Sequence, residues 1–69
     1  MNDFSLSFLS HFFGQPVTVD TPLGAFAGFL RKADGPQHSG IGNLLLETWE
    51  SHLLLIKTWF SVKGGAERV

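Results

Sequence analysis

Cysteine is absent from this chain of 69 residues. Its absence excludes disulfides and cysteine–zinc sites, and nothing indicates a disulfide-stapled secreted mini-protein. A domain this short buries only about 60% of the surface that its unfolded chain exposes, so it is near the lower limit for folding alone. Without a disulfide, we expect self-association into a homo-oligomer to supply the missing stabilisation.

Positive charge is also scarce, and it is not clustered. Five Lys and Arg residues stand against six Asp and Glu, which gives a formal net charge of −1. General adhesion to a phosphate backbone is disfavoured, because that binding scales with the number of phosphates neutralised, and no DNA partner is expected. A local site for single-stranded nucleic acid, based on stacking, stays open.

Long apolar runs and a basic leader are missing as well. No apolar run reaches the ~20 residues of a membrane span, and no basic region precedes the apolar residues near the N-terminus. We therefore expect a cytoplasmic protein without a membrane partner. A single domain is expected over residues 1–63, followed by a flexible tail over 64–69.

The N-terminal segment predicts a helix over about residues 3–13. Asn2 or Asp3 can cap its first turn, and Gly14 and Pro16 prevent its continuation. One face of this helix would be apolar, carrying Phe4, Phe8, Leu9, Phe12 and Phe13. A strand is the alternative reading, because SLSFLS partly alternates.

From Pro16 onward the apolar residues recur with a period of two, which predicts strands. We expect a first strand over about 16–21, a second over 25–33, a loop over 34–42, a third strand from Asn43, a hairpin at Glu50-Ser51, a fourth strand from His52, a turn near Lys57-Thr58 and a fifth strand over 59–63. The leucine runs could instead be helical, since leucine prefers helix, but their β-branched and aromatic neighbours favour strands. The predicted fold class is mostly β: a helix, then a five-stranded, strongly bent antiparallel barrel.

The stretch FAGFLRKAD carries two local predictions. Gly28, inside the second strand, indicates a bend or the close approach of another backbone. Arg31 and Lys32 are adjacent in this strand, so alternation sends them to opposite faces.

Catalytic and metal chemistry find little support in the sequence. His11, His38 and His52 lie in different elements and lack the close spacing of metal ligands. No nucleophile motif or phosphate-binding glycine loop occurs. We expect no enzyme activity, no cofactor and no metal site.

The order and spacing of these elements resemble those of the Sm-like proteins, which include eukaryotic Sm and Lsm proteins and bacterial Hfq. Phe26-Ala27-Gly28-Phe29-Leu30 followed by Asp34 fits the first Sm motif, and Asn43-Leu44-Leu45-Leu46-Glu47 resembles the segment that closes it. Ile56-Lys57-Thr58 partly matches the second motif, usually Ile-Arg-Gly. Two departures fall in the family's RNA-binding loops: the aspartate and asparagine stand further apart than usual, and Thr58 replaces the glycine.

The resemblance implies an SH3-like barrel that forms a homo-oligomeric ring, with the fourth strand of one subunit paired to the fifth strand of the next. It also implies single-stranded RNA binding at loops beside the pore. The matching residues are Asn43 and Lys57 for base and phosphate, Asp34 for orienting the loop, and His38 or Ile41 at the stacking position.

Simpler readings of the same residues remain open. His38 could be a solvated loop histidine, Asn43 an ordinary residue at a strand entrance, and Lys57 a surface lysine. Trp49, Trp59 and Phe60 fit core or interface packing better than ligand stacking. The alternative function is therefore a small barrel that serves as an assembly or protein-interaction module without nucleic acid.

Overall fold

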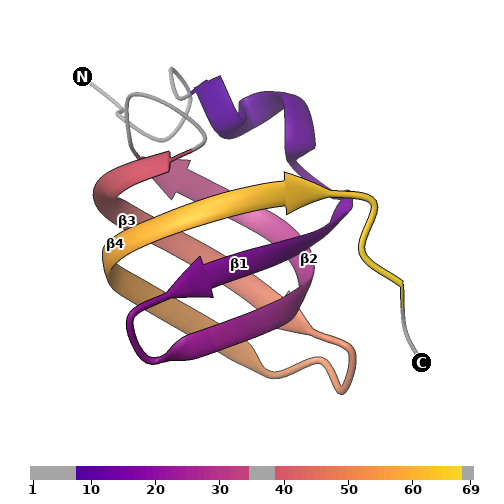
Figure 1. The fold of residues 1–69 in the computed structure, drawn as a ribbon. Coiled ribbons are helices and arrows are strands. Elements are labelled where there is room, and N and C mark those ends of the chain that lie inside the picture. Colours follow the sequence, from indigo (N-terminus) through magenta and orange to yellow (C-terminus); the bar gives the residue numbers. More distant parts are fainter. Residues whose placement is uncertain (1–7, 35–38, 68–69) are drawn as a thin grey trace.

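The computed structural model describes residues 8–34 and 39–67, and these form a short helix and four strands that close into an antiparallel barrel (Figure 1). The elements are the 3₁₀ helix η2 (Phe8–Phe12), β1 (Pro16–Thr21), β2 (Gly24–Asp34), β3 (Ser39–Thr48) and β4 (Leu53–Gly64). Each strand pairs with the next, and β4 returns to pair with β1. The mostly β fold predicted from the sequence is confirmed.

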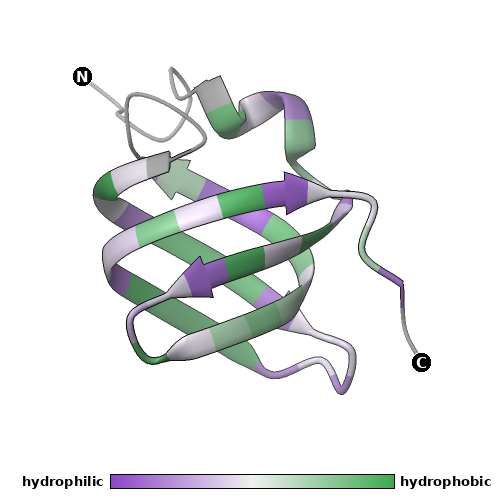
Figure 2. Cartoon of the chain, viewed as in Figure 1, coloured by the Kyte–Doolittle hydropathy of each residue, from purple (hydrophilic) through white to green (hydrophobic). Residues whose placement is uncertain are grey.

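The core lies inside this barrel and follows the period of two. Val17 and Val19 of β1 and Leu44 and Leu46 of β3 are fully buried, whereas the residues between them are half-buried. Figure 2 shows the corresponding alternation of apolar and polar residues along the strands. The remaining buried apolar side chains are Leu9, Leu30, Ala33, Ile56, Phe60 and Val62.

The predicted N-terminal helix over 3–13 is not confirmed. In the described part of the chain, Phe8–Phe12 forms one 3₁₀ helix, and the Phe13 N–H bonds to the Ser10 carbonyl, three residues back. Residues 1–7 lie outside the described chain. Short helices are only marginally stable on their own. This one is held in place by packing, because Leu9 lies in the core and Phe12 and Phe13 pack against it. Gly14 ends the element with φ of 79°, as predicted.

The predicted fourth and fifth strands are one strand. The expected turn at Lys57-Thr58 is wrong, since both residues lie inside β4. The pairing changes along this strand instead: Leu53–Ser61 pairs with β3, and Ser61–Gly64 pairs with β1 (Figure 1). A barrel can close in this way because a long staggered strand contacts one neighbour with each half.

The predicted loop over 34–42 is shorter than expected. β2 runs to Asp34 and β3 begins at Ser39, so Gly40, Ile41 and Gly42 belong to a strand. Their glycines suggested a loop, but pairing with Thr58, Trp59 and Phe60 of β4 holds this segment extended. The expected positions of β1, β2 and the hairpin at Glu50-Ser51 are confirmed.

Gly28 lies where β2 passes between β1 and β3, paired with Val17 on one side and Thr48 on the other. A Cβ atom at this position would collide with the Glu47 carbonyl oxygen and lie 3.0 Å from the Thr48 Cα. The predicted close approach of another backbone is therefore confirmed.

Candidate nucleic-acid interface

Three of the candidate binding residues form one row across the sheet. Asp34 of β2 is the register partner of Asn43 of β3, and Asn43 is the partner of Lys57 of β4. Directly paired residues project from the same face of a sheet, with neighbouring strands about 4.8 Å apart. We call Asp34, Asn43 and Lys57 the polar row.

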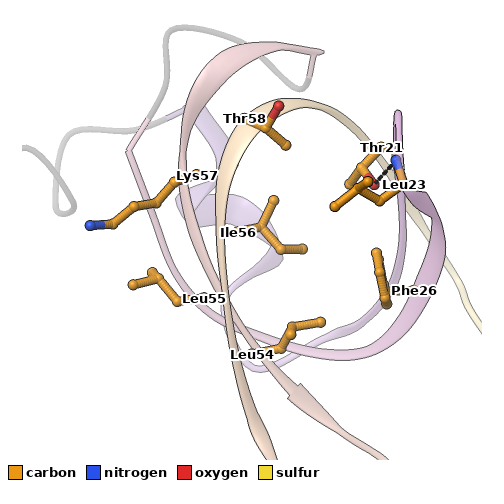
Figure 3. A pocket seen from close by; sticks show the side chains of 8 residues that line it. All are labelled: Thr21, Leu23, Phe26, Leu54, Leu55, Ile56, Lys57 and Thr58. Atoms are coloured by element: carbon orange, nitrogen blue, oxygen red, sulfur yellow. Dashed lines mark hydrogen bonds between the residues drawn. The ribbon is translucent and has the colours of Figure 1, made fainter.

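The polar row lies on the outside of the barrel. Ile56, the neighbour of Lys57, is buried in the core, while Lys57 is exposed. Figure 3 shows the Lys57 side chain pointing away from the interior into which Ile56 projects. The row is therefore open to a ligand that lies across the outer surface.

Ile41 is placed beside the polar row, two residues along β3 from Asn43. Its register partner is Trp59, and these two side chains are 78% and 43% exposed. The sequence reading assigned Trp59 to core or interface packing and left the stacking position to Ile41 or His38. The sequence signal that could have found Trp59 is the alternation of side chains along a strand. Trp59 stands two residues from Lys57 and therefore shares its face. His38 lies outside the described chain.

On the other side of the polar row, a β-bulge changes the direction of two basic side chains. Register between β2 and β3 shifts between Leu30 and Lys32, and both Arg31 and Lys32 are exposed. The prediction that they point to opposite faces is wrong, because the bulge adds a residue and interrupts the alternation. Lys32 is the register partner of Leu45 in β3, and Leu45 is in turn the register partner of Leu55 in β4.

Arg31 is engaged with its neighbours on this outer surface. Its Nε donates to Glu47 Oε1 at 2.7 Å, and its guanidinium lies 5.5 Å from the centre of the Phe29 ring. Phe29 in turn meets Trp49 edge to face at 5.1 Å. Trp49 is half-buried against Phe29 and does not belong to the core cluster, so the core packing expected for it is not confirmed. The guanidinium charge is already balanced by Glu47, and Lys57 is the cation of the polar row itself.

The two halves of β4 leave two strand edges open on opposite sides. Among the described residues, no strand pairs with Leu53–Phe60 on the side away from β3, and none pairs with Val62–Gly64 on the side away from β1. We call the first of these the β4 open edge. Leu53 and Leu55 on it are 66% and 53% exposed.

A pocket of about 190 Å³ lies alongside the β4 open edge (Figure 3). Its lining side chains come from the end of β1, the β1–β2 turn, β2 and the inner face of β4: Thr21, Leu23, Phe26, Leu54, Ile56 and Thr58. Leu55 and Lys57 also border it, but their side chains point away in Figure 3. We call this cavity the edge pocket.

Within residues 8–34 and 39–67, no group of three His, Asp or Glu residues is placed to hold a metal ion. The same part of the chain contains no helix that is long and apolar enough to cross a membrane. No protein-family model, curated protein or solved structure matches the chain.

Proposed function

We propose that this chain is the subunit of an Sm-like homo-oligomeric ring that binds single-stranded RNA across the polar row. The observation that carries the proposal is the pairing of β4, which leaves one edge open along Leu53–Phe60 and the opposite edge open along Val62–Gly64. The ring and its RNA site are two steps, and each is tested separately below.

Open strand edges support the assembly step. An unpaired apolar edge is a template for pairing with another chain, and proteins usually shorten, charge or cover such edges. The β4 open edge carries Leu53 and Leu55, with Lys57 as its cation. Two complementary edges on opposite sides of one strand allow head-to-tail pairing, which gives a closed ring when the rotation between copies closes.

The Sm-like resemblance gives this geometry a precedent. In that family the fourth strand of one subunit pairs with the fifth strand of the next. In this chain the two halves of β4 take the places of those two strands, because the strand changes partner at Ser61. An Sm-like barrel with a continuous fourth and fifth strand is the fold assignment we propose.

The outer surface supports the RNA step. Asn43 and Lys57 are adjacent in the polar row and offer an amide for a base edge and a cation for a phosphate, while Trp59 beside them offers an aromatic face. Stacking of one base on an aromatic side chain contributes about 1–3 kcal/mol. One such row gives weak binding, but a ring repeats it in every subunit and so raises the overall affinity.

The assembly step is tested by molar mass in solution, measured by light scattering over a dilution series. The wild-type chain should give a multiple of the monomer mass. Leu55→Lys places a charge on the β4 open edge and should shift the population to monomers. Ala25→Lys is the matched control, because Ala25 is exposed and belongs to β2, which does not form that edge. A monomeric wild-type chain at all concentrations would refute the ring.

The RNA step is tested by fluorescence anisotropy with short U-rich and A-rich single strands. Trp59→Ala should weaken binding by roughly 5- to 150-fold, the equivalent of one lost stack. Asn43→Ala and Lys57→Ala should also weaken it. Lys63→Ala removes an exposed lysine from the same strand outside the polar row and should have a small effect. Unchanged affinity in Asn43→Ala, Lys57→Ala and Trp59→Ala alike would refute the site.

The second candidate function is an assembly or protein-interaction module that binds no nucleic acid. The observation in its favour is the exposed apolar surface of β4, set beside a formal net charge of −1. The ratio of absorbance at 260 and 280 nm of the purified protein separates the two functions. An assembled protein that carries no nucleic acid and binds neither RNA probe would favour the protein-interaction module.

A further inference from the structure

The Asp34 carboxylate, at one end of the polar row, is open to a ligand. Asp34 is half-buried, and within residues 8–34 and 39–67 no hydrogen bond or ion pair joins its carboxylate to another group. The other acidic residue of β2, β3 and β4 is Glu47, and its carboxylate is bonded to Arg31. Asp34 therefore has acceptor capacity that its own fold does not use.

The polar row has a chemical direction. Register places Lys57, Asn43 and Asp34 side by side in that order on neighbouring strands. The lysine ammonium only donates hydrogen bonds, the asparagine amide both donates and accepts, and an ionised carboxylate only accepts. The row therefore runs from a donor end at Lys57 to an acceptor end at Asp34.

The outer surface next to the polar row gives a nucleic-acid base a place to lie. Ile41 and Trp59 are exposed register partners, and they stand two residues along their strands from Asn43 and Lys57. Two residues of a strand span about 6.6 Å. A base that rests on the Ile41–Trp59 pair can turn one edge toward Asn43, with Asp34 on one side of that edge and Lys57 on the other.

The acceptor end of the row separates bases by their exocyclic groups. Guanine, cytosine and adenine carry an amino group, which donates, on the Watson–Crick edge that proteins read in single strands. Uracil carries a carbonyl oxygen at each end of that edge, and such an oxygen beside Asp34 would face the carboxylate without a hydrogen between them. Guanine has two adjacent donors, N1–H and the amino group, and can bond both carboxylate oxygens at once, which is the stronger arrangement.

We infer that Asp34 makes the site select bases with an exocyclic amino group over uracil, with guanine bound most tightly. The inference rests on the proposed RNA function and names its base preference. The Sm-like resemblance gives Asp34 the role of orienting a loop. Its place in β2, paired with Asn43, instead makes it a specificity-determining residue that contacts the ligand.

Fluorescence anisotropy with paired RNA strands tests the inference. One strand is U-rich, and the other is the same strand with isolated uridines replaced by guanosines. The wild-type chain should bind the guanosine strand at least about fivefold more tightly, the lower end of the discrimination given by one bidentate base contact. Inosine in place of guanosine removes only the amino group and should abolish most of this gain.

Asp34→Asn keeps the shape of the side chain but adds an amide that can donate to a uracil oxygen. The ratio of the two dissociation constants should fall by at least about fivefold. Loss of a negative charge by itself strengthens binding to every strand alike, so the ratio is the informative quantity. Asp20→Asn is the matched control, because it makes the same charge change on β1, which does not pair with β3, and its ratio should match wild type. Circular dichroism checks the fold of each variant.

The outcomes separate base selection from RNA binding. A wild-type preference for the guanosine strand that Asp34→Asn removes supports the inference. If the wild type binds both strands equally, or if a folded Asp34→Asn keeps the wild-type ratio, base selection by Asp34 is refuted while the RNA site stands. If the wild type binds none of the strands, the RNA function itself is refuted, and base selection falls with it.

Discussion

Gly28→Ala tests the close contact between β2 and β3. Gly28 is buried, and the three atoms nearest to an added Cβ all belong to backbone: the Glu47 carbonyl oxygen, the Glu47 carbonyl carbon at 2.9 Å and the Thr48 Cα at 3.0 Å. A flexible side chain could turn away from a methyl group, but these atoms move only if β3 moves. The strain must therefore be taken by the pairing of the two strands.

The expected cost follows from overpacking of a tight interior. Insertion of extra carbon into a packed site costs about 1–3 kcal/mol, and we expect the upper part of this range because the contacts are backbone atoms. A chain of this length has a free energy of unfolding of roughly 3–10 kcal/mol. Gly28→Ala should thus remove a large part of it and lower the Tm by roughly 10–20 °C.

Urea denaturation followed by circular dichroism measures this loss, at one fixed protein concentration because self-association changes apparent stability. Gly64→Ala is the comparison. An added Cβ there would lie 2.8 Å from Cε1 of the Phe12 ring, a half-buried side chain that can shift. Gly64→Ala should therefore cost clearly less. A Gly28→Ala loss below about 0.5 kcal/mol, within the range of ordinary surface substitutions, would refute the reasoning.

Four further substitutions test three other parts of the structure by the same denaturation assay. Ser51 has φ of 67° in the β3–β4 turn, so Ser51→Gly should raise the free energy of unfolding by about 0.5–1 kcal/mol; a loss would contradict the left-handed backbone. Leu46 is fully buried and Leu45 half-buried, so Leu46→Ala should cost about 2–5 kcal/mol and Leu45→Ala less than half of that; equal losses would contradict the assigned faces. The Arg31–Glu47 pair is partly exposed to solvent, so Arg31→Gln should cost less than about 1 kcal/mol and still less in high salt; a larger loss would show that the pair is a major source of stability.

The sequence allowed good prediction wherever local alternation and burial agree. The period of two located β1 and β2, because a half-buried strand must alternate apolar and polar residues. Gly28 was interpreted correctly for a similar reason: a strand tolerates glycine poorly unless another backbone needs the space.

Prediction failed where the pairing of strands overrides local preference. Glycines around Ile41 suggested a loop, yet β4 holds this segment extended by cross-strand pairing. Lys57-Thr58 suggested a turn, but one strand continues through it and changes partner at Ser61. The bulge at Arg31 depends on the register between β2 and β3, which a single strand does not encode.

The candidate site shows the same contrast between what the sequence predicts and what strand pairing decides. Asp34, Asn43 and Lys57 were selected by their resemblance to family positions, and their residue types alone indicate amide and charge chemistry. Only register places them in one row with Trp59 beside them, because residues distant in sequence become neighbours when strands pair. By itself, the sequence determined a small, mostly β domain without a disulfide or a cysteine–zinc site to stabilise it. The tertiary structure decided which edges of β4 remain open and which side chains share a face, since both depend on how a short chain closes into a barrel.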